Sequence, residues 1–197
     1  LALAAKQGDV ACLTLLLEAG ADKDLADPSY YTPLYFASEY GHAECVKLLL
    51  EAGADAEHAV DFDMGKTPLH AASGKDHVEC VKLLLEAGAD KGHVDKYGGT
   101  PLHDASMCEG GRCVKLLLEA GADKDSVDGE GQTPLHYASE GNLGSLERLL
   151  EAGANKDRVD KKGRTPLHNA AMHSTHCNCL RPLLDAGADA SLRDFNG

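Results

Sequence analysis

The 197-residue sequence contains no tryptophan, few aromatic residues and far fewer basic than acidic side chains. Lysine and arginine total 19 against 32 aspartates and glutamates, so the formal net charge is −13. A nucleic-acid-binding surface needs clustered lysine and arginine opposite the phosphates, and an anionic membrane surface attracts the same side chains. The acidic balance therefore argues against both kinds of partner.

Long apolar runs and catalytic signatures are also missing. No run approaches the roughly 18 apolar residues that a membrane-spanning helix needs, and no signal-peptide pattern stands at the start. There is no glycine-rich phosphate loop, no nucleophile elbow and no His-Glu-x-x-His motif. Many acidic residues instead recur at equivalent positions, namely Glu18, Glu51, Glu86, Glu119 and Glu151. We expect no membrane insertion, no enzyme activity and no cofactor.

What the chain does contain is one phrase, Thr-Pro-Leu-His-x-Ala, written repeatedly. Its threonines are Thr67, Thr100, Thr133 and Thr165, and a looser copy begins at Thr32. The intervals between successive threonines are 35, 33, 33 and 32 residues. A second phrase, Glu-Ala-Gly-Ala, keeps the same period, and its glycines are Gly20, Gly53, Gly88, Gly121 and Gly153, with Gly187 continuing the series.

A period near 33 residues with this wording resembles the ankyrin-repeat family, and the resemblance covers almost the whole chain. It implies a mostly α fold: a solenoid of stacked helix-turn-helix units with projecting β-hairpin-like fingers. We expect a single array over residues 1–197. The expected repeats are 1–27, which is capping-like, then 28–61, 62–94, 95–127, 128–159 and 160–193, with 194–197 opening a truncated repeat. We also expect the natural protein to continue beyond Gly197.

Each repeat has a local physical logic. Threonine before proline caps a first helix, and proline suits its first position. Leu69 and Ala72 then form a narrow apolar face, while Gly53 is suited to ending a second helix in the left-handed conformation. A later Asp-x-x-Gly, as in Asp95 to Gly98, favours a tight turn at the finger tip.

Three departures from the pattern predict local irregularity. Tyr30 stands where the tip glycine is expected, so that finger should bend differently. The finger over Glu57–Lys66 is two residues longer than the others, and Phe62 spoils its Asp-x-x-Gly. Pro182 falls within the sixth second helix, which we expect to be shortened or kinked.

Five of the seven cysteines lie eight residues before a repeat glycine, at Cys12, Cys45, Cys80, Cys113 and Cys179. Stacked helices lie about 8–10 Å apart, and a disulfide needs Cα atoms closer than about 7 Å. We therefore expect these five to be buried small apolar residues and all seven to be unbridged. Unbridged cysteines favour a reducing compartment, the cytoplasm or the nucleus.

Histidines invite a metal hypothesis. The repeated His70, His103, His136 and His168 resemble the structural histidine of the family, and stacking keeps them too far apart to share a metal ion. The run His173 to Cys179 holds two histidines and two cysteines, but its spacing matches no usual zinc site, so an irregular loop is the favoured interpretation. Some family members carry hydroxylated asparagine four residues after the repeat glycine. Here that position holds Asp24, Glu57, Gly92, Asp125, Asp157 and Ser191, so this modification is not expected.

The leading functional hypothesis is a monomeric protein–protein interaction module. Its partner, a protein of unknown identity, would dock on the concave face, meaning the finger tips and the exposed side of the first helices. Side chains vary there while the frame repeats. The candidates are Tyr31, Glu39, Tyr40, Asp63, Met64, Lys66, Lys75, Lys96, Tyr97, Met107, Glu130, Gln132, Glu140, Lys161, Lys162, Arg164, Met172 and His173. Alternatives are the substrate-recruiting or regulatory arm of a larger enzyme, such as a ubiquitin-ligase adaptor or a kinase, and a mechanical spacer.

Overall fold

The computed structural model describes residues 1–60, 64–172 and 178–195, and it contains six consecutive pairs of short helices. The first, or inner, helices are α1 (Ala2–Gln7), α3 (Pro33–Glu39), α5 (Pro68–Ser73), α7 (Pro101–Ser106), α9 (Pro134–Ala138) and α11 (Pro166–Met172). The second, or outer, helices are α2 (Val10–Glu18), α4 (Ala43–Glu51), α6 (Val78–Glu86), α8 (Arg112–Glu119), α10 (Leu143–Glu151) and α12 (Leu180–Asp185).

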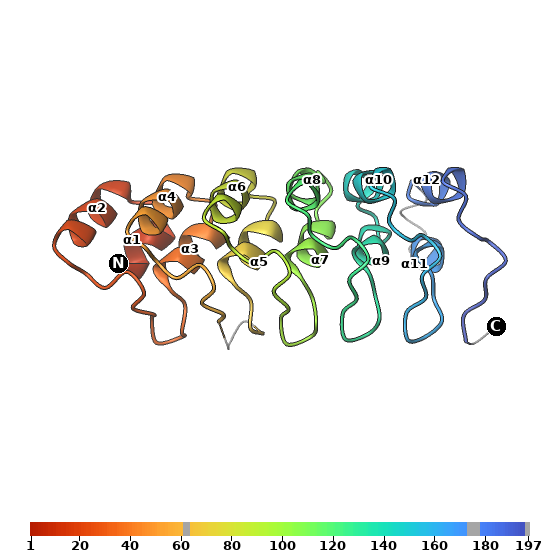
Figure 1. Ribbon diagram of the computed structural model, residues 1–197, viewed down its shortest axis with the longest axis horizontal. Coiled ribbons are helices and arrows are strands. Elements are labelled where there is room, and N and C mark those ends of the chain that lie inside the picture. Colours follow the sequence, from red (N-terminus) through yellow and green to blue (C-terminus); the bar gives the residue numbers. More distant parts are fainter. Residues whose placement is uncertain (61–63, 173–177, 196–197) are drawn as a thin grey trace.

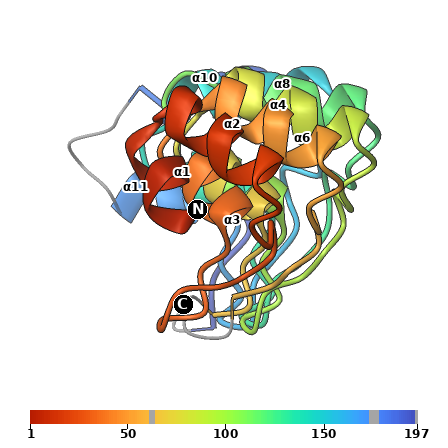
Figure 2. The ribbon, with the colours of Figure 1, turned by 90° about the vertical axis from the view of Figure 1, so that its left-hand side faces the viewer.

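The pairs stack into an elongated array. Figure 1 shows the inner and outer helices as two rows along the long axis, with the two termini at opposite ends. The loops that join each outer helix to the next inner helix extend away from both rows, as the end view in Figure 2 shows. We call these loops the first to fifth fingers, and we call the segment that follows α12 the sixth finger. The six fingers comprise residues 19–32, 52–67, 87–100, 120–133, 152–165 and 186–195.

The inner helices begin where the sequence predicts. The side-chain oxygen of Thr32 accepts the backbone N–H of Tyr35 at 3.2 Å, and a proline opens the helix that follows. In the later repeats the capping box is reciprocal, because the histidine of Thr-Pro-Leu-His bonds back to the threonine N–H, as His70 does to Thr67. These bonds satisfy helix-end donors that would otherwise be orphaned.

The apolar core runs the length of the array instead of forming a centre. Its members are leucines of the inner helices, such as Leu69 and Leu102, with a cysteine, a valine and a leucine from each of α4, α6 and α8 and leucines from the other outer helices. Inner helices contact their neighbours along the row, and each inner helix also packs against the outer helix of its own repeat, so the core continues from one repeat to the next. Within the described residues, no helix is long and apolar enough to cross a membrane.

The fingers are turns and loops more than β-structure. The described residues contain a single antiparallel bridge, between Val60 and Lys66 of the long second finger. Tyr30 adopts a left-handed φ of 66°, and its N–H donates to Asp27 O at 2.9 Å, just as Gly98 N–H does to Asp95 O. The prediction that this finger bends differently at its tip is therefore wrong, because Tyr30 accepts the strained glycine conformation.

The helix α12 and the junction between the fourth and fifth repeats depart from the regular structure. The α12 helix has only six residues and starts at Leu180, so Pro182 lies in its first turn and the predicted shortening is confirmed. A close backbone approach joins the fourth and fifth repeats, since a Cβ on Gly144 would collide with Glu109 O and one on Gly111 would lie 2.5 Å from Gly144 O. Phe62, Asp61, His176 and Cys177, about which the sequence raised hypotheses, lie outside the described residues, as does Gly197.

The cysteine ladder departs from the prediction at one end. Cys45, Cys80, Cys113 and Cys179 are buried as expected, but Cys12 is exposed. Cys45 belongs to the apolar core that neighbouring repeats share, whereas Cys12, in the first described repeat, does not. All six described cysteines are free of disulfides.

Candidate functional site

In the first, third, fourth and fifth fingers, one aspartate side chain accepts two backbone N–H groups of the tip. Asp95 Oδ1 accepts the backbone N–H groups of Tyr97 and Gly99, both at 2.8 Å. The same two bonds recur at Asp27 in the first finger, Asp128 in the fourth and Asp160 in the fifth. Because this frame uses only one carboxylate and backbone groups, the side chains at the tips are left to vary.

The finger tips are also joined to one another. Lys96 N–H donates to Met64 O at 2.7 Å, and Gly129 N–H donates to Tyr97 O at 2.5 Å. The series continues with Lys161 N–H to Glu130 O at 2.9 Å and with Phe195 N–H to Lys162 O at 3.0 Å. From the second finger to the sixth, the tips therefore form a row that backbone hydrogen bonds hold together.

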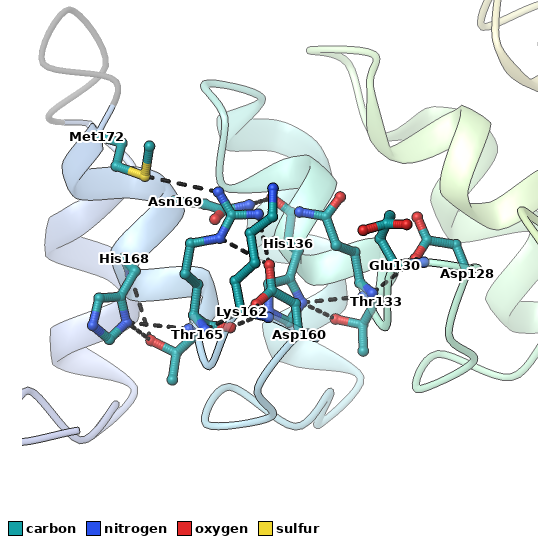
Figure 3. A network of polar contacts seen from close by, with 12 residues as sticks. Asp128, Glu130, Thr133, His136, Asp160, Lys162, Thr165, His168, Asn169 and Met172 are labelled. Atoms are coloured by element: carbon teal, nitrogen blue, oxygen red, sulfur yellow. Dashed lines mark hydrogen bonds and ion pairs between the residues drawn. The ribbon is translucent and has the colours of Figure 1, made fainter. Parts of the chain in front are cut away.

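The Thr-Pro-Leu-His histidines tie each inner helix to the next finger. His136 Nδ1 accepts Thr133 N–H at 3.1 Å, and its Nε2 donates to Arg164 O at 3.0 Å. Figure 3 shows this residue beside the equivalent Thr165 and His168 pair. His103 and His70 make the same contacts, with Gln132 O and Gly99 O respectively. They join the frame of the surface, as the sequence predicts for structural histidines.

Burial keeps these histidines neutral. Desolvation lowers the pKa of His70 to about 4, although the bond to Gly99 O opposes the change. It also lowers the pKa values of His103 and His136. A neutral ring with its proton on Nε2 is the form that accepts at Nδ1 and donates onward, so the protonation state and the stacking are coupled.

An aromatic cluster occupies the N-terminal part of the concave face. The Tyr31 ring lies 5.1 Å from that of Tyr35 and 5.3 Å from that of Phe36, measured between centroids. Lys6 Nζ lies 5.0 Å from the Phe36 centroid and 5.6 Å from that of Tyr40. This face therefore already holds a cation against its rings.

Two hollows follow along the concave face. One, of about 250 Å³, lies over α5 between Glu39 and Met107. The other, of about 480 Å³, lies between the third and fourth fingers, where Tyr97 and Tyr137 line it. The Tyr137 hydroxyl donates to Asp128 Oδ2 at 2.8 Å, and burial together with this carboxylate raises the pKa of Tyr137.

At the C-terminal end, the charged side chains brace the chain itself. Arg164 Nε and Nη2 donate to Asp160 Oδ2 at 2.9 and 2.6 Å, and Nη1 lies 3.9 Å from the Met172 sulfur (Figure 3). Burial alone would raise the pKa of Asp160, but the guanidinium and two backbone N–H groups hold it below its usual value. Arg164 is thus committed to the fifth finger.

The predicted site residues divide into three groups. Those with exposed side chains are Tyr40, Met64, Lys75, Lys96, Tyr97, Met107, Glu130, Glu140, Lys161, Lys162 and Met172. Those partly buried or paired within the chain are Tyr31, Glu39, Lys66, Gln132 and Arg164. Asp63 and His173 lie outside the described residues. The row of exposed residues runs along the whole array, so no single point gathers them.

Sequence reasoning missed the variable position inside Thr-Pro-Leu-His-x-Ala. It holds Phe36, Ala71, Asp104, Tyr137 and Asn169, which lie on the concave side of the inner helices. Asp104, for example, receives Lys66 Nζ on both carboxylate oxygens at 2.7 and 2.8 Å. The signal was available, since this is the one position within the repeated phrase that differs in every copy.

Chemistry of other kinds has little support in the described part of the chain. There, no group of three histidine, cysteine or acidic side chains is placed to hold a metal ion. The only run with metal-ligand composition, His173 to Cys179, lies largely outside the described residues.

Comparison with known proteins gives a consistent result. The family model for ankyrin repeats (three copies) matches residues 1–95, 58–128, 87–160 and 102–194. The crystal structure of the human ASB11 ankyrin repeat domain is 31% identical with a TM-score of 0.90, over 100% of this chain and 87% of that one. The ankyrin repeat domain of Bcl-3, a member of the IkappaB protein family, is 31% identical with a TM-score of 0.82, over 99% and 89% respectively. No curated protein sequence matches the chain.

Proposed function

Since this chain belongs to the ankyrin-repeat family, we propose that it binds a partner protein on its concave face. Ankyrin repeats are protein–protein interaction modules. Which face the partner takes is the finer question, and the distribution of variable side chains favours the finger tips and inner helices.

The observation that carries this proposal is the separation of frame from surface. The Thr–His and aspartate bonds satisfy the polar groups of the fingers internally. The side chains left at the surface include Tyr97, Met107 and Met172, which are 63%, 49% and 65% exposed. Tyrosine and methionine amid charged residues are the composition of a recognition surface.

The outer helices offer much less variety. The phrase Cys-Val-Lys-Leu-Leu-Leu-Glu occurs in α4, α6 and α8 alike, so Lys47, Lys82 and Lys115 present the same group three times. A partner that must find one register along the array needs different groups at different places. The uniform outer surface is therefore the weaker candidate.

Site-specific photo-crosslinking tests the choice of face. A benzoylphenylalanine is placed at Tyr97 or Met107 on the concave face, or at Lys82 on α6 as the matched control, and partners are captured from cell extract. We expect the first two positions, but not Lys82, to crosslink one common protein. Crosslinking of that protein only from Lys82 would refute the concave face. In binding kinetics, Tyr97→Ala should chiefly speed dissociation, because a central aromatic anchor contributes about 2 kcal/mol or more.

A further inference from the structure

The inner helix α5 differs from its neighbours at two positions on the concave face. These positions hold Phe36 and Glu39 of α3, Asp104 of α7 with Met107 just after that helix, Tyr137 of α9 with Glu140 two residues beyond that helix, and Asn169 and Met172 of α11. In the third repeat they hold Ala71 of α5 and Gly74, the residue that follows this helix. The third repeat therefore recedes where every neighbour presents a large or polar side chain.

This absence makes the hollow of about 250 Å³ over α5. Its lining includes Ala71 and Gly74 from the third repeat, Tyr35 and Glu39 of α3 from the repeat before, and Met107, just after α7, from the repeat after. Liquid water occupies about 30 Å³ per molecule, so the space equals about eight waters. Pockets for free small molecules start near 300 Å³, so the hollow has the size of one long side chain.

Gly74 is not required by the backbone. Its φ and ψ are −69° and −6°, which any residue adopts, and an added Cβ would meet nothing closer than 3.5 Å. Glycine at a helical position costs about 0.5–1 kcal/mol relative to alanine. Gly74 therefore lowers the stability of the fold slightly, and its missing side chain leaves the hollow over α5 open.

The charges around the hollow select its occupant. Lys66 and Asp104 close one end as a pair, with side chains only 22% and 10% exposed. Glu39 is partly buried in the wall, and no ion pair to it is present within the described residues. Lys75, at the rim, is exposed and therefore screened by solvent. The net charge of −13 draws basic segments toward the protein.

We propose that this hollow receives an arginine side chain from an extended segment of the partner, which makes it a specificity pocket of the proposed protein-binding face. The guanidinium pairs with Glu39, and the aliphatic stem lies on Ala71 against the Met107 thioether. Tyr35 is a further lining residue, and on this face Lys6 already packs over Phe36 and Tyr40. The pocket thus combines one carboxylate with soft apolar walls.

Methionine methyl NMR tests the pocket without knowledge of the partner. The chain has three methionines: Met107 lines the hollow, while Met64 and Met172 lie elsewhere on the same face and serve as internal controls. The probes are the capped tripeptides acetyl-Gly-X-Gly-amide with X as arginine, glutamate or leucine. We expect the arginine probe alone to shift the Met107 methyl, saturating with a Kd on the order of 1–10 mM.

Two variants sharpen the result. Glu39→Gln should weaken binding of the arginine probe by about fivefold or more, whereas Glu140→Gln, at the matching position of the fifth repeat, should leave this binding unchanged. Gly74→Leu fills the hollow and should abolish the Met107 shift, and a thermal melt no lower than that of the parent would show that the fold persists.

A Met107 shift with glutamate or leucine equal to that with arginine would overturn the proposal. So would equal shifts of all three methyls, which would indicate diffuse attraction to an acidic surface, or no shift at all. These failures leave the protein-binding function standing if Tyr97 still crosslinks a partner. Loss of the Tyr97 crosslink together with a positive arginine result would instead remove the function and keep the pocket.

Discussion

The first and second repeats place the same residue types at the same positions and bury them differently. Leu16 and Leu49 are equivalent, 33 residues apart in the outer helices α2 and α4, yet Leu16 is 39% exposed and Leu49 is fully buried. Cys12 is exposed, while Cys45 is buried. The repeat itself therefore does not decide burial; the repeat stacked on its N-terminal side does.

The comparison shows where the stability of this molecule lies. Leu3 and Leu15 of the first repeat are each 66% exposed, so this repeat leaves large apolar side chains in water. Each internal repeat gains its core, its histidine bonds and its finger contacts from a neighbour. Stability is then a sum over junctions, and the predictions below test single junctions.

The largest expected effect comes from truncating equivalent leucines. Leu49→Ala should lower the free energy of unfolding by about 2–5 kcal/mol, because it leaves a cavity in the core. Leu16→Ala should cost about 1 kcal/mol or less, since much of that side chain is in water already. Urea unfolding followed by circular dichroism measures both. Equal losses would mean that another surface covers the first repeat in solution, and analytical ultracentrifugation would then show association.

The next effect is acid destabilisation through the stacked histidines. The folded-state pKa of His70 is about 4 against an ordinary 6.5, so above pH 6.5 both states are neutral and the full stability is present. As the pH falls toward 4, the unfolded chain takes up the proton first and stability is lost. One pKa unit corresponds to about 1.4 kcal/mol, so His70 alone should lower the free energy of unfolding by about 3 kcal/mol at pH 4.

His103 and His136 should add to that loss, because their pKa values are also lowered by burial. Urea unfolding at several pH values between 7.5 and 4.5 measures the slope. His70→Gln provides the control. It removes one of the three buried histidines, so the free energy of unfolding should fall less steeply with pH. A stability that stays constant down to pH 5 would show that these histidines are not held neutral.

Thiol labelling gives a third test of the same contrast. Cys12 should react with a thiol reagent in the native protein, while Cys80 should not. Burial raises the pKa of the Cys80 thiol to about 11 from 9.0, which lowers its thiolate fraction about a hundredfold before access is counted. Mass spectrometry of timed samples should show Cys12 labelled first, and labelling of Cys80 as fast as Cys12 would refute the buried ladder.

The repeated phrases of the sequence were enough to predict the helix pairs and their start at Thr-Pro, and the family resemblance implied the structural role of His70, His103 and His136, because these features are local or repeat with the fold. That burial keeps these histidines neutral needed the structure. The exposure of Cys12 was predicted wrongly, since its environment depends on a neighbour that its own repeat does not encode. The left-handed Tyr30 was missed because the surrounding Asp27 bonds hold the turn against the preference of the residue.

The hollow over α5 needed the structure, since only stacking shows that Ala71 and Gly74 lie together between larger neighbours. The recruiting-arm alternative remains a prediction, because the array would have the same geometry in either role.

The smallest expected effect concerns carboxylates that join successive fingers. Asp24, Glu57, Asp125 and Asp157 each accept a backbone N–H of the following repeat, from Asp55, Asp90, Asn155 and Asp189 respectively, at 2.7–2.8 Å. This is the position where asparagine is hydroxylated in some family members, and in this chain it forms a bond between repeats. At the junction between the third and fourth repeats the position holds Gly92, which supplies no side chain.

Gly92→Asp should therefore install the missing bond to the Asp123 N–H and raise the unfolding free energy by about 0.5–1.5 kcal/mol. The site can accept a side chain, because the nearest atom to an added Cβ, Asp90 Oδ1, is 3.4 Å away. Part of any gain would come from replacing glycine, so Gly92→Ala is the matched control and should recover only that part.

Asp125→Ala should lower the unfolding free energy by a similar amount, since it removes the bond to Asn155 N–H. Hydrogen exchange of the Asp123 amide gives a direct measure, and it should slow in Gly92→Asp but not in Gly92→Ala. If Gly92→Asp and Gly92→Ala gain equally and the Asp123 amide is unchanged, the carboxylates do not couple the repeats, and the difference between the first repeat and the others rests on apolar burial alone.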